Sequence, residues 1–150
     1  MKRELQMNLT GIYLLLVLCS LMIIPIFVYF SYIIKISDSL IKSLIYIGCS
    51  GGIGGTLYSI RGFYKNLGGN TFEMKWFWWY IFRPPISIVA GIFVYFLIIG
   101  GLLSVGTVSD INYSKSVMFY CAIAFLAGYA FSRFAEKLED IIEILFSKEK

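Results

Sequence analysis

The chain has 150 residues, of which 59% are hydrophobic, 18% aromatic and only 15% charged, with a net charge of +4 and a mean hydropathy of +0.79. A soluble domain carries about 25% charged residues, so this composition excludes a water-soluble fold, and the abundance of aromatic and aliphatic residues excludes intrinsic disorder. It predicts an all-α, polytopic membrane protein.

Several kinds of chemistry are missing from the sequence. Histidine is absent, which excludes histidine-dependent catalysis and histidine ligands for haem or zinc. The three cysteines, Cys19, Cys49 and Cys121, have no CxxC spacing. The acidic residues fall outside or at the edges of the apolar stretches, which argues against proton-coupled transport. We therefore expect no enzyme activity, no metal site, no cofactor and no nucleic-acid partner.

Four stretches reach the length of about 20 apolar residues that a helix needs to cross a bilayer. The predicted spans cover residues 11–34, 40–60, 80–103 and 114–131, and residues 133–150 follow as a tail. The chain begins with basic residues, as a signal peptide does, but its apolar run is too long for one, so we expect a retained span. Pro25 should kink this first helix.

Basic and aromatic residues predict the orientation in the membrane. Ten of the 13 basic residues lie in the N-terminus, in the loop between the second and third spans, and in the tail. The positive-inside rule then places both termini in the cytoplasm, most simply at a bacterial inner membrane. Lys42 and Arg83 lie near span ends, where their side chains can reach the headgroups and leave the hydrocarbon core free of charge. The predicted interface anchors are Arg61, Lys65, Lys75, Trp76, Trp78, Trp79 and Arg83.

Small residues recur at helical spacing on three of the predicted spans. Such faces let helix backbones approach closely in lipid. One interpretation is that they hold a single four-helix bundle together; another is that they line an oligomer axis or a pore. Because these faces exceed the needs of one small bundle, we expect a homo-oligomer. The predicted packing residues are Gly48, Gly51, Gly52, Gly54, Gly55, Ser87, Gly91, Ala124, Gly128 and Ser132.

The tail has an apolar pattern that continues from the fourth span without a break, and it predicts a cytoplasmic amphipathic helix extending from that span. Its apolar seam repeats at intervals of three and four residues, as in a short coiled coil. Acidic residues outnumber basic ones four to two between residues 133 and 143, which favours a protein partner or self-association over an anionic membrane surface. The seam residues are Phe131, Phe134, Leu138, Ile141 and Leu145.

Residues 125–134 (FLAGYAFSRF), with a glycine-rich span ending in Arg61 and Gly62, are similar to small bacterial four-helix membrane proteins of anti-phage defence systems, such as the Kiwa membrane subunit. The resemblance implies a homo-oligomeric pore-forming or membrane-perturbing effector, or a membrane sensor, that works with a cytoplasmic protein. The alternatives are a passive membrane scaffold that anchors such a partner, and a small channel or holin-like protein.

Overall fold

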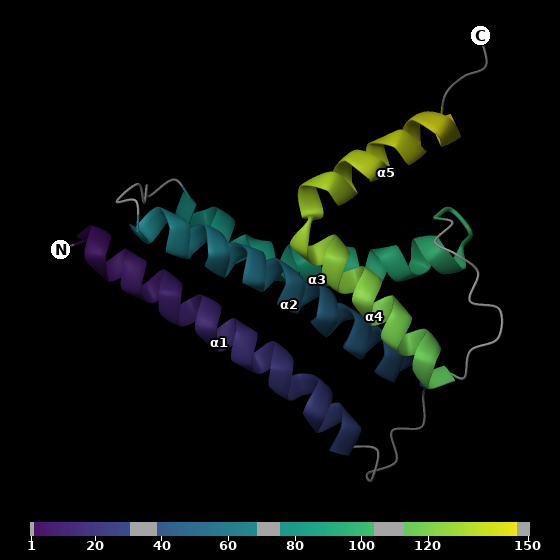
Figure 1. Ribbon diagram of the computed structural model, residues 1–150, viewed down its shortest axis with the longest axis horizontal. Coiled ribbons are helices and arrows are strands. Elements are labelled where there is room, and N and C mark those ends of the chain that lie inside the picture. The colour runs from purple at the N-terminus through teal and green to yellow at the C-terminus, as the bar shows by residue number, and fades with distance from the viewer. Residues whose placement is uncertain (1, 31–38, 69–75, 104–112, 147–150) are drawn as a thin grey trace.

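The computed structural model describes residues 2–30, 39–68, 76–103 and 113–146, and it confirms the all-α fold (Figure 1). Five helices follow one another along the chain: α1 (Lys2–Phe30), α2 (Ser39–Gly68), α3 (Phe77–Ile99), α4 (Tyr113–Tyr129) and α5 (Phe131–Phe146).

The lengths and hydropathies of these helices identify a multi-pass membrane protein. Segments Met7–Tyr29, Leu40–Gly68 and Phe77–Ile99 are each long and apolar enough to cross a bilayer. A fourth span is possible if Ser116–Tyr129 and Phe131–Ile144 count as one broken crossing. Three to four of the predicted spans are thus confirmed.

The helix ends differ from the predicted spans. Helix α2 continues for two turns beyond residue 60, so Arg61 and Lys65 lie on the helix and not in the predicted loop. Helix α3 starts at Phe77 and ends at Ile99, a few residues earlier at both ends than expected. The predicted anchors Trp78 and Trp79 therefore lie in the first turn of this helix.

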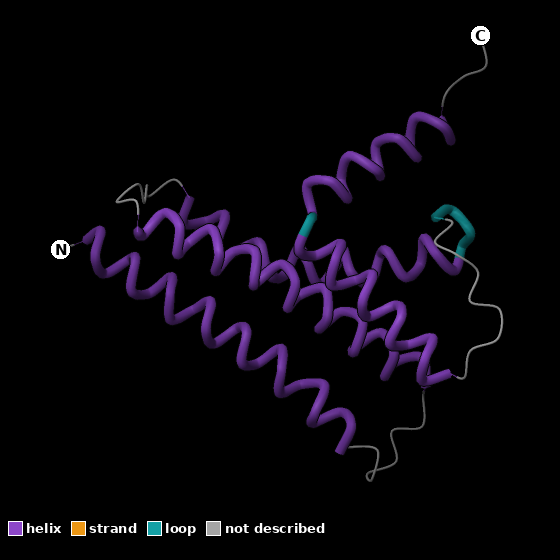
Figure 2. Tube along the Cα trace, in the orientation of Figure 1, coloured by secondary structure: helices purple, strands orange, loops and turns teal. Residues whose placement is uncertain are grey.

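Helix α2 lies in the middle of the bundle and packs against α1, α3 and α4. Helices α1, α2 and α4 follow roughly the same diagonal direction, whereas the later part of α3 turns away from it (Figures 1 and 2). Its glycines explain how it can contact α3 and α4 so closely. A Cβ atom added to Gly51 would lie 2.6 Å from the carbonyl oxygen of Ser87 and 3.0 Å from the Cα of Gly91. A Cβ atom on Gly128 of α4 would overlap the carbonyl oxygen of Gly51. Backbone thus lies against backbone at both contacts.

The other small residues of α2 are also covered by the same chain. Added Cβ atoms on Gly54 and Gly55 would overlap the carbonyl oxygen of Phe125 and the side chain of Ser87, respectively. Ile88 and Ile92 of α3 lie over Gly48, and Ile88 and Leu21 over Gly52, while Ala124 of α4 is fully buried. Ser132 is exposed beyond the end of α4. The faces of α2, α3 and α4 that carry small residues therefore pack against one another within one chain. They give no reason to expect a second copy of the chain.

Prolines inside two helices leave the helices continuous. Helix α1 runs through Pro25, and α3 runs through Pro84 and Pro85. Because Pro85 has no N–H, the carbonyl of Ile81, four residues earlier, loses its helical donor. The Tyr13 hydroxyl of α1 donates a hydrogen bond to this carbonyl oxygen over 2.9 Å. A side chain from a neighbouring helix thus replaces the hydrogen-bond donor that proline removes.

The tail is a helix that extends from α4, as predicted, but the two helices do not share one axis. The chain bends by 100° between the segments Ser116–Tyr129 and Phe131–Ile144, and Figure 2 shows a short non-helical link at that point. The N–H of Ala130 still bonds to the Leu126 carbonyl, and the N–H of Phe134 to the Ala130 carbonyl. The bend therefore keeps the backbone hydrogen bonds on both sides, and it turns the first apolar residues of α5 toward α3.

Candidate anion site at the tryptophan-rich end

One end of the bundle, which we call the tryptophan-rich end, combines the last turns of α2, the first turns of α3 and the bend between α4 and α5. Arg83 is the seventh residue of α3, about 9 Å along the axis from the start of the helix. Only 8% of its surface is exposed, so its side chain is enclosed by other side chains of the protein. That Arg83 anchors the span at the membrane interface stays a prediction.

Three aromatic rings surround the guanidinium of Arg83. The distance from its Cζ to the ring centroid is 4.9 Å for Tyr58, 5.4 Å for Trp79 and 5.0 Å for Phe131. These distances fall within the range of cation–π attraction. The rings belong to α2, α3 and α5, so this cluster joins α5 to the other two helices just after the bend.

The aromatic rings do not supply hydrogen-bond acceptors for the N–H groups of the guanidinium. The Nε of Arg83 is buried and has no hydrogen-bond partner. Within residues 2–30, 39–68, 76–103 and 113–146, the Ser59 hydroxyl is the only other buried side-chain group in that condition. A buried donor without an acceptor costs free energy, and a charged one costs more. Arg83 is thus suited to bind an anion.

A second basic region lies beside the first. Arg61, on the outer part of α2, donates a hydrogen bond from Nη1 to the Tyr129 hydroxyl over 2.9 Å. Asn66 likewise donates from Nδ2 to the Tyr80 hydroxyl over 2.9 Å, which ties α2 to α3. Between them opens a pocket of about 410 Å³, lined by Tyr58, Arg61, Gly62, Lys65, Asn66, Trp76, Trp79 and Tyr80. Its two cations and its aromatic walls are typical of a site for an anionic group.

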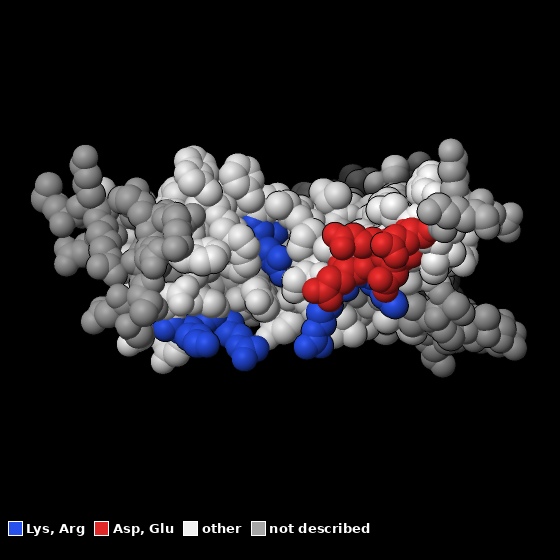
Figure 3. All heavy atoms as spheres, turned by 90° about the horizontal axis from the view of Figure 1, so that it is seen from above, with Lys and Arg blue, Asp and Glu red and all other residues white. Residues whose placement is uncertain are grey.

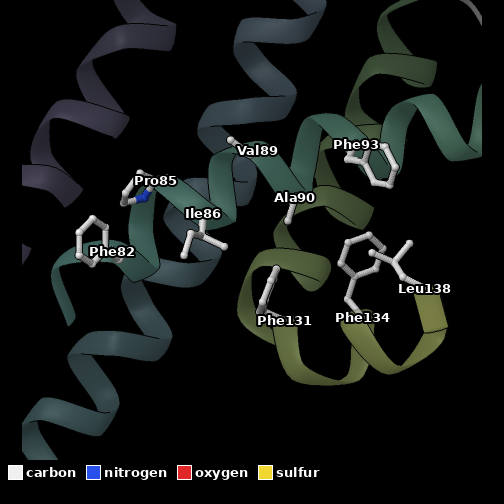
Figure 4. A pocket seen from close by; sticks show the side chains of 9 residues that line it. All are labelled: Phe82, Pro85, Ile86, Val89, Ala90, Phe93, Phe131, Phe134 and Leu138. Carbon is white, nitrogen blue, oxygen red and sulfur yellow. The ribbon is translucent and has the colours of Figure 1, made fainter. Parts of the chain in front are cut away.

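Apolar space lies on the other side of Arg83. A pocket of about 230 Å³ is lined by Trp78, Trp79, Phe82, Arg83, Ile86 and Phe131. Three of these residues, Phe82, Ile86 and Phe131, also line a groove of about 420 Å³ between α3 and α5. Figure 4 shows the groove, with Phe134 and Leu138 of α5 across from the α3 side chains. We call it the α3–α5 groove; its lining residues are Phe82, Pro85, Ile86, Val89, Ala90, Phe93, Phe131, Phe134 and Leu138.

The structure brings most of the predicted anchors together. Arg61, Lys65, Trp76 and Trp79 line the basic pocket, and Trp78 joins Trp79 beside Arg83. Lys75 lies outside the described residues.

The predicted seam of the tail divides into two parts. Phe131, Phe134 and Leu138 line the α3–α5 groove, and Ile141 is half-buried. The side chain of Leu145 lies outside the description. Acidic side chains gather on the opposite, outer face of α5 (Figure 3), and they belong to Glu136, Glu139, Asp140 and Glu143.

Sequence reasoning did not assign Tyr58, Tyr129 or the α3 side of the groove to a site. The α3 residues follow a helical pattern from Phe82 to Phe93 that is indistinguishable from an ordinary lipid-facing stripe. The one available signal was Arg83 itself, a cation placed after seven aromatic or apolar residues.

Comparisons of the chain with models of known protein families, with curated proteins and with solved structures gave no match. The described residues also contain no cluster of three cysteine or acidic residues that could hold a metal ion. The class that the fold defines is that of a multi-pass helical membrane protein.

Proposed function

We propose that this protein is the membrane-seated sensor subunit of an anti-phage defence system in a bacterial inner membrane, with both termini in the cytoplasm, and that α5 recruits a cytoplasmic partner. The observation that carries the proposal is the position of α5. We propose that α4 crosses the membrane without α5, in place of one broken crossing made by both helices. The 100° bend between them then leaves α5 along the surface with its acidic side chains outward.

The defence context rests on the resemblance of residues 125–134 and of the glycine-rich span of α2 to such membrane subunits. In the structure, the Gly51–Gly128 contact and the α4–α5 bend lie within these two segments. Charge complementarity suggests a partner with a basic surface, which would meet Glu139 and Glu143 on α5.

The sensor role is favoured over a pore-forming effector by the way the glycines are used. Gly51, Gly54 and Gly128 hold backbones together within one chain, which leaves them unable to line a pore. A homo-oligomer would have to form through the outer faces of α1 and α3, where large apolar side chains such as Leu16 and Phe96 are exposed. Such an assembly remains compatible with a sensor.

The direct test is protection against phage. A susceptible bacterium should carry the chain together with its chromosomal neighbours, and plaques should be counted with and without the chain. We expect protection that disappears when the chain is removed, and that falls in the double variant Glu139→Gln/Glu143→Gln. Lys137→Gln is the matched control on the same helix, because its exposed pair with Asp140 over 3.0 Å contributes little to stability. Equal plaque counts with and without the chain would refute the defence role.

Dye release from liposomes separates the sensor from the effector. Pure protein in sealed vesicles should cause no leakage if the chain is a sensor, and leakage from the protein alone would favour the pore-forming alternative. Lethal lesions on expression alone would indicate a holin.

A second candidate function, a passive scaffold, is favoured by the seam on α5. In that case, polar substitution of Phe134, Leu138 and Ile141 should abolish recruitment of the partner and leave membrane permeability unchanged.

A further inference from the structure

The strongest unexplained feature of the molecule is the buried cation. Arg83 is more than nine-tenths buried, its Nε lacks a hydrogen-bond partner, and its other close neighbours are the rings of Tyr58, Trp79 and Phe131. Aromatic rings attract the positive charge but cannot accept its in-plane N–H groups as a phosphate or a carboxylate does. An anion with oxygen acceptors would satisfy the donor that these rings leave unpaired.

The pocket next to Arg83 is continuous with the α3–α5 groove. The pocket of about 230 Å³ at the guanidinium shares Phe82, Ile86 and Phe131 with the α3–α5 groove. From there the groove follows one face of α3 to Phe93, about 16 Å further along the axis. It thus runs from the tryptophan-rich end toward the middle of the predicted span (Figure 4).

This arrangement matches the two parts of a membrane lipid. We propose that one anionic phospholipid binds here, with its phosphate on the guanidinium of Arg83 and one acyl chain in the α3–α5 groove. The side chains of Trp78 and Trp79 flank the phosphate position, at the depth where tryptophan meets lipid headgroups. The groove is lined by hydrocarbon and aromatic side chains throughout, as an acyl chain requires.

The continuity of the groove with the pocket at Arg83 favours a lipid as its occupant. One molecule that fills both must join an anionic group to a narrow apolar chain, as a phospholipid does. The lipid would contact α3 and α5 at once and so hold α5 at its angle. This inference does not depend on the proposed function, because it concerns lipid and not a protein partner.

Native mass spectrometry of the full chain in an uncharged detergent tests the proposal. The probes are phosphatidylglycerol and phosphatidylcholine with identical acyl chains. We expect the first phosphatidylglycerol to bind about tenfold more tightly than phosphatidylcholine, since phosphatidylcholine has a compensating positive charge. Arg83→Gln should reduce this preference to less than about twofold. Arg133→Gln, which removes an exposed arginine just beyond the bend, should leave the preference intact.

A second pair of variants tests the groove without touching the buried cation. Val89 lies in the groove and is 66% exposed, so Val89→Trp should fold and yet fill the space for the acyl chain. We expect it to weaken the binding of phosphatidylglycerol several-fold. Leu16→Trp is the control, because Leu16 is 65% exposed on α1 and lies outside the groove.

Four outcomes of the binding measurements would overturn the proposal. They are equal affinity for the two lipids, an equal loss in Arg83→Gln and Arg133→Gln, no effect of Val89→Trp, and displacement of phosphatidylglycerol by millimolar inorganic phosphate. The last result would show that the site takes a free anion and not a lipid. A dimer that contains no lipid and is disrupted by Val89→Trp would equally refute it, because a second copy would then occupy the groove.

Discussion

The centre of α2 and its outer end pack against the neighbouring helices in opposite ways. At the centre, Gly51 and Gly128 have no side chains, so the backbones of α2, α3 and α4 lie in direct contact and leave no room to move. At the tryptophan-rich end the helices are held apart by rings, which enclose Arg83 and leave pockets beside it. The rigid part of this protein is thus made from its smallest residues, and its potential binding sites are made from its largest.

The largest effect should come from disturbing the glycine contact. Gly128→Ala would place a methyl group against the carbonyl oxygen of Gly51, and a backbone atom cannot turn aside as a side chain can. We expect a loss of about 3 kcal/mol or more, measured as the midpoint of unfolding in a denaturing-detergent titration. Gly62→Ala is the control: its added methyl group would lie 3.7 Å from the Tyr80 hydroxyl, and it should stabilise the helix by up to about 1 kcal/mol. Equal midpoints for the two variants would contradict the rigid centre.

Removal of a ring at the other end should cost less. Phe131→Ala deletes one of the three rings around Arg83 and also the side chain that seats the bend. We expect a loss of about 2 kcal/mol and a wider range of α5 positions. Distances between spin labels on Val89 and Ile142, both exposed, would report that range. An unchanged distance distribution would show that the ring does not fix α5.

The hydrogen bond that repairs the proline helix should have a smaller effect. Tyr13→Phe removes the donor to the Ile81 carbonyl and keeps the ring. We expect a loss of about 1 kcal/mol in the same detergent titration, because the carbonyl left behind is partly buried. Pro85→Ala would restore the helical N–H, so the double variant should recover most of that loss. If the double variant is as unstable as Tyr13→Phe, the assigned role of Tyr13 is wrong.

The exposed bond between Arg61 and the Tyr129 hydroxyl should have the smallest effect. Tyr129→Phe removes the acceptor, and we expect a change below about 0.5 kcal/mol, because water can replace an exposed partner. A change as large as that of Phe131→Ala would mean that the tryptophan-rich end is as rigid as the glycine contact.

The sequence was sufficient to predict the membrane class, the spans and the close approach of helices at the glycines. It could not show what lies against those glycines, because small-residue spacing describes a smooth face and carries no information about which helix covers it. Nor could it show the bend, since Ala130 is neither proline nor glycine, and the apolar spacing from Phe131 to Leu145 is the same for a straight and a bent helix. The site around Arg83 could be predicted only from the neighbours of each helix and from the bend together. Two of its rings come from α2 and from the far side of the bend.

The unequal burial of the spans also has a consequence for how the protein is made. The candidate span in α1 is 17% buried, whereas that in α2 is 50% buried, and α2 has the lowest mean hydropathy of the three. The segment synthesised first can therefore settle in lipid by itself. The segment synthesised second is least able to do so, because its glycines gain little from lipid contact until α3 and α4 have emerged from the ribosome. Insertion of this chain should thus pass through a stage at which α2 depends on the insertion machinery, and failures of biogenesis should concentrate there.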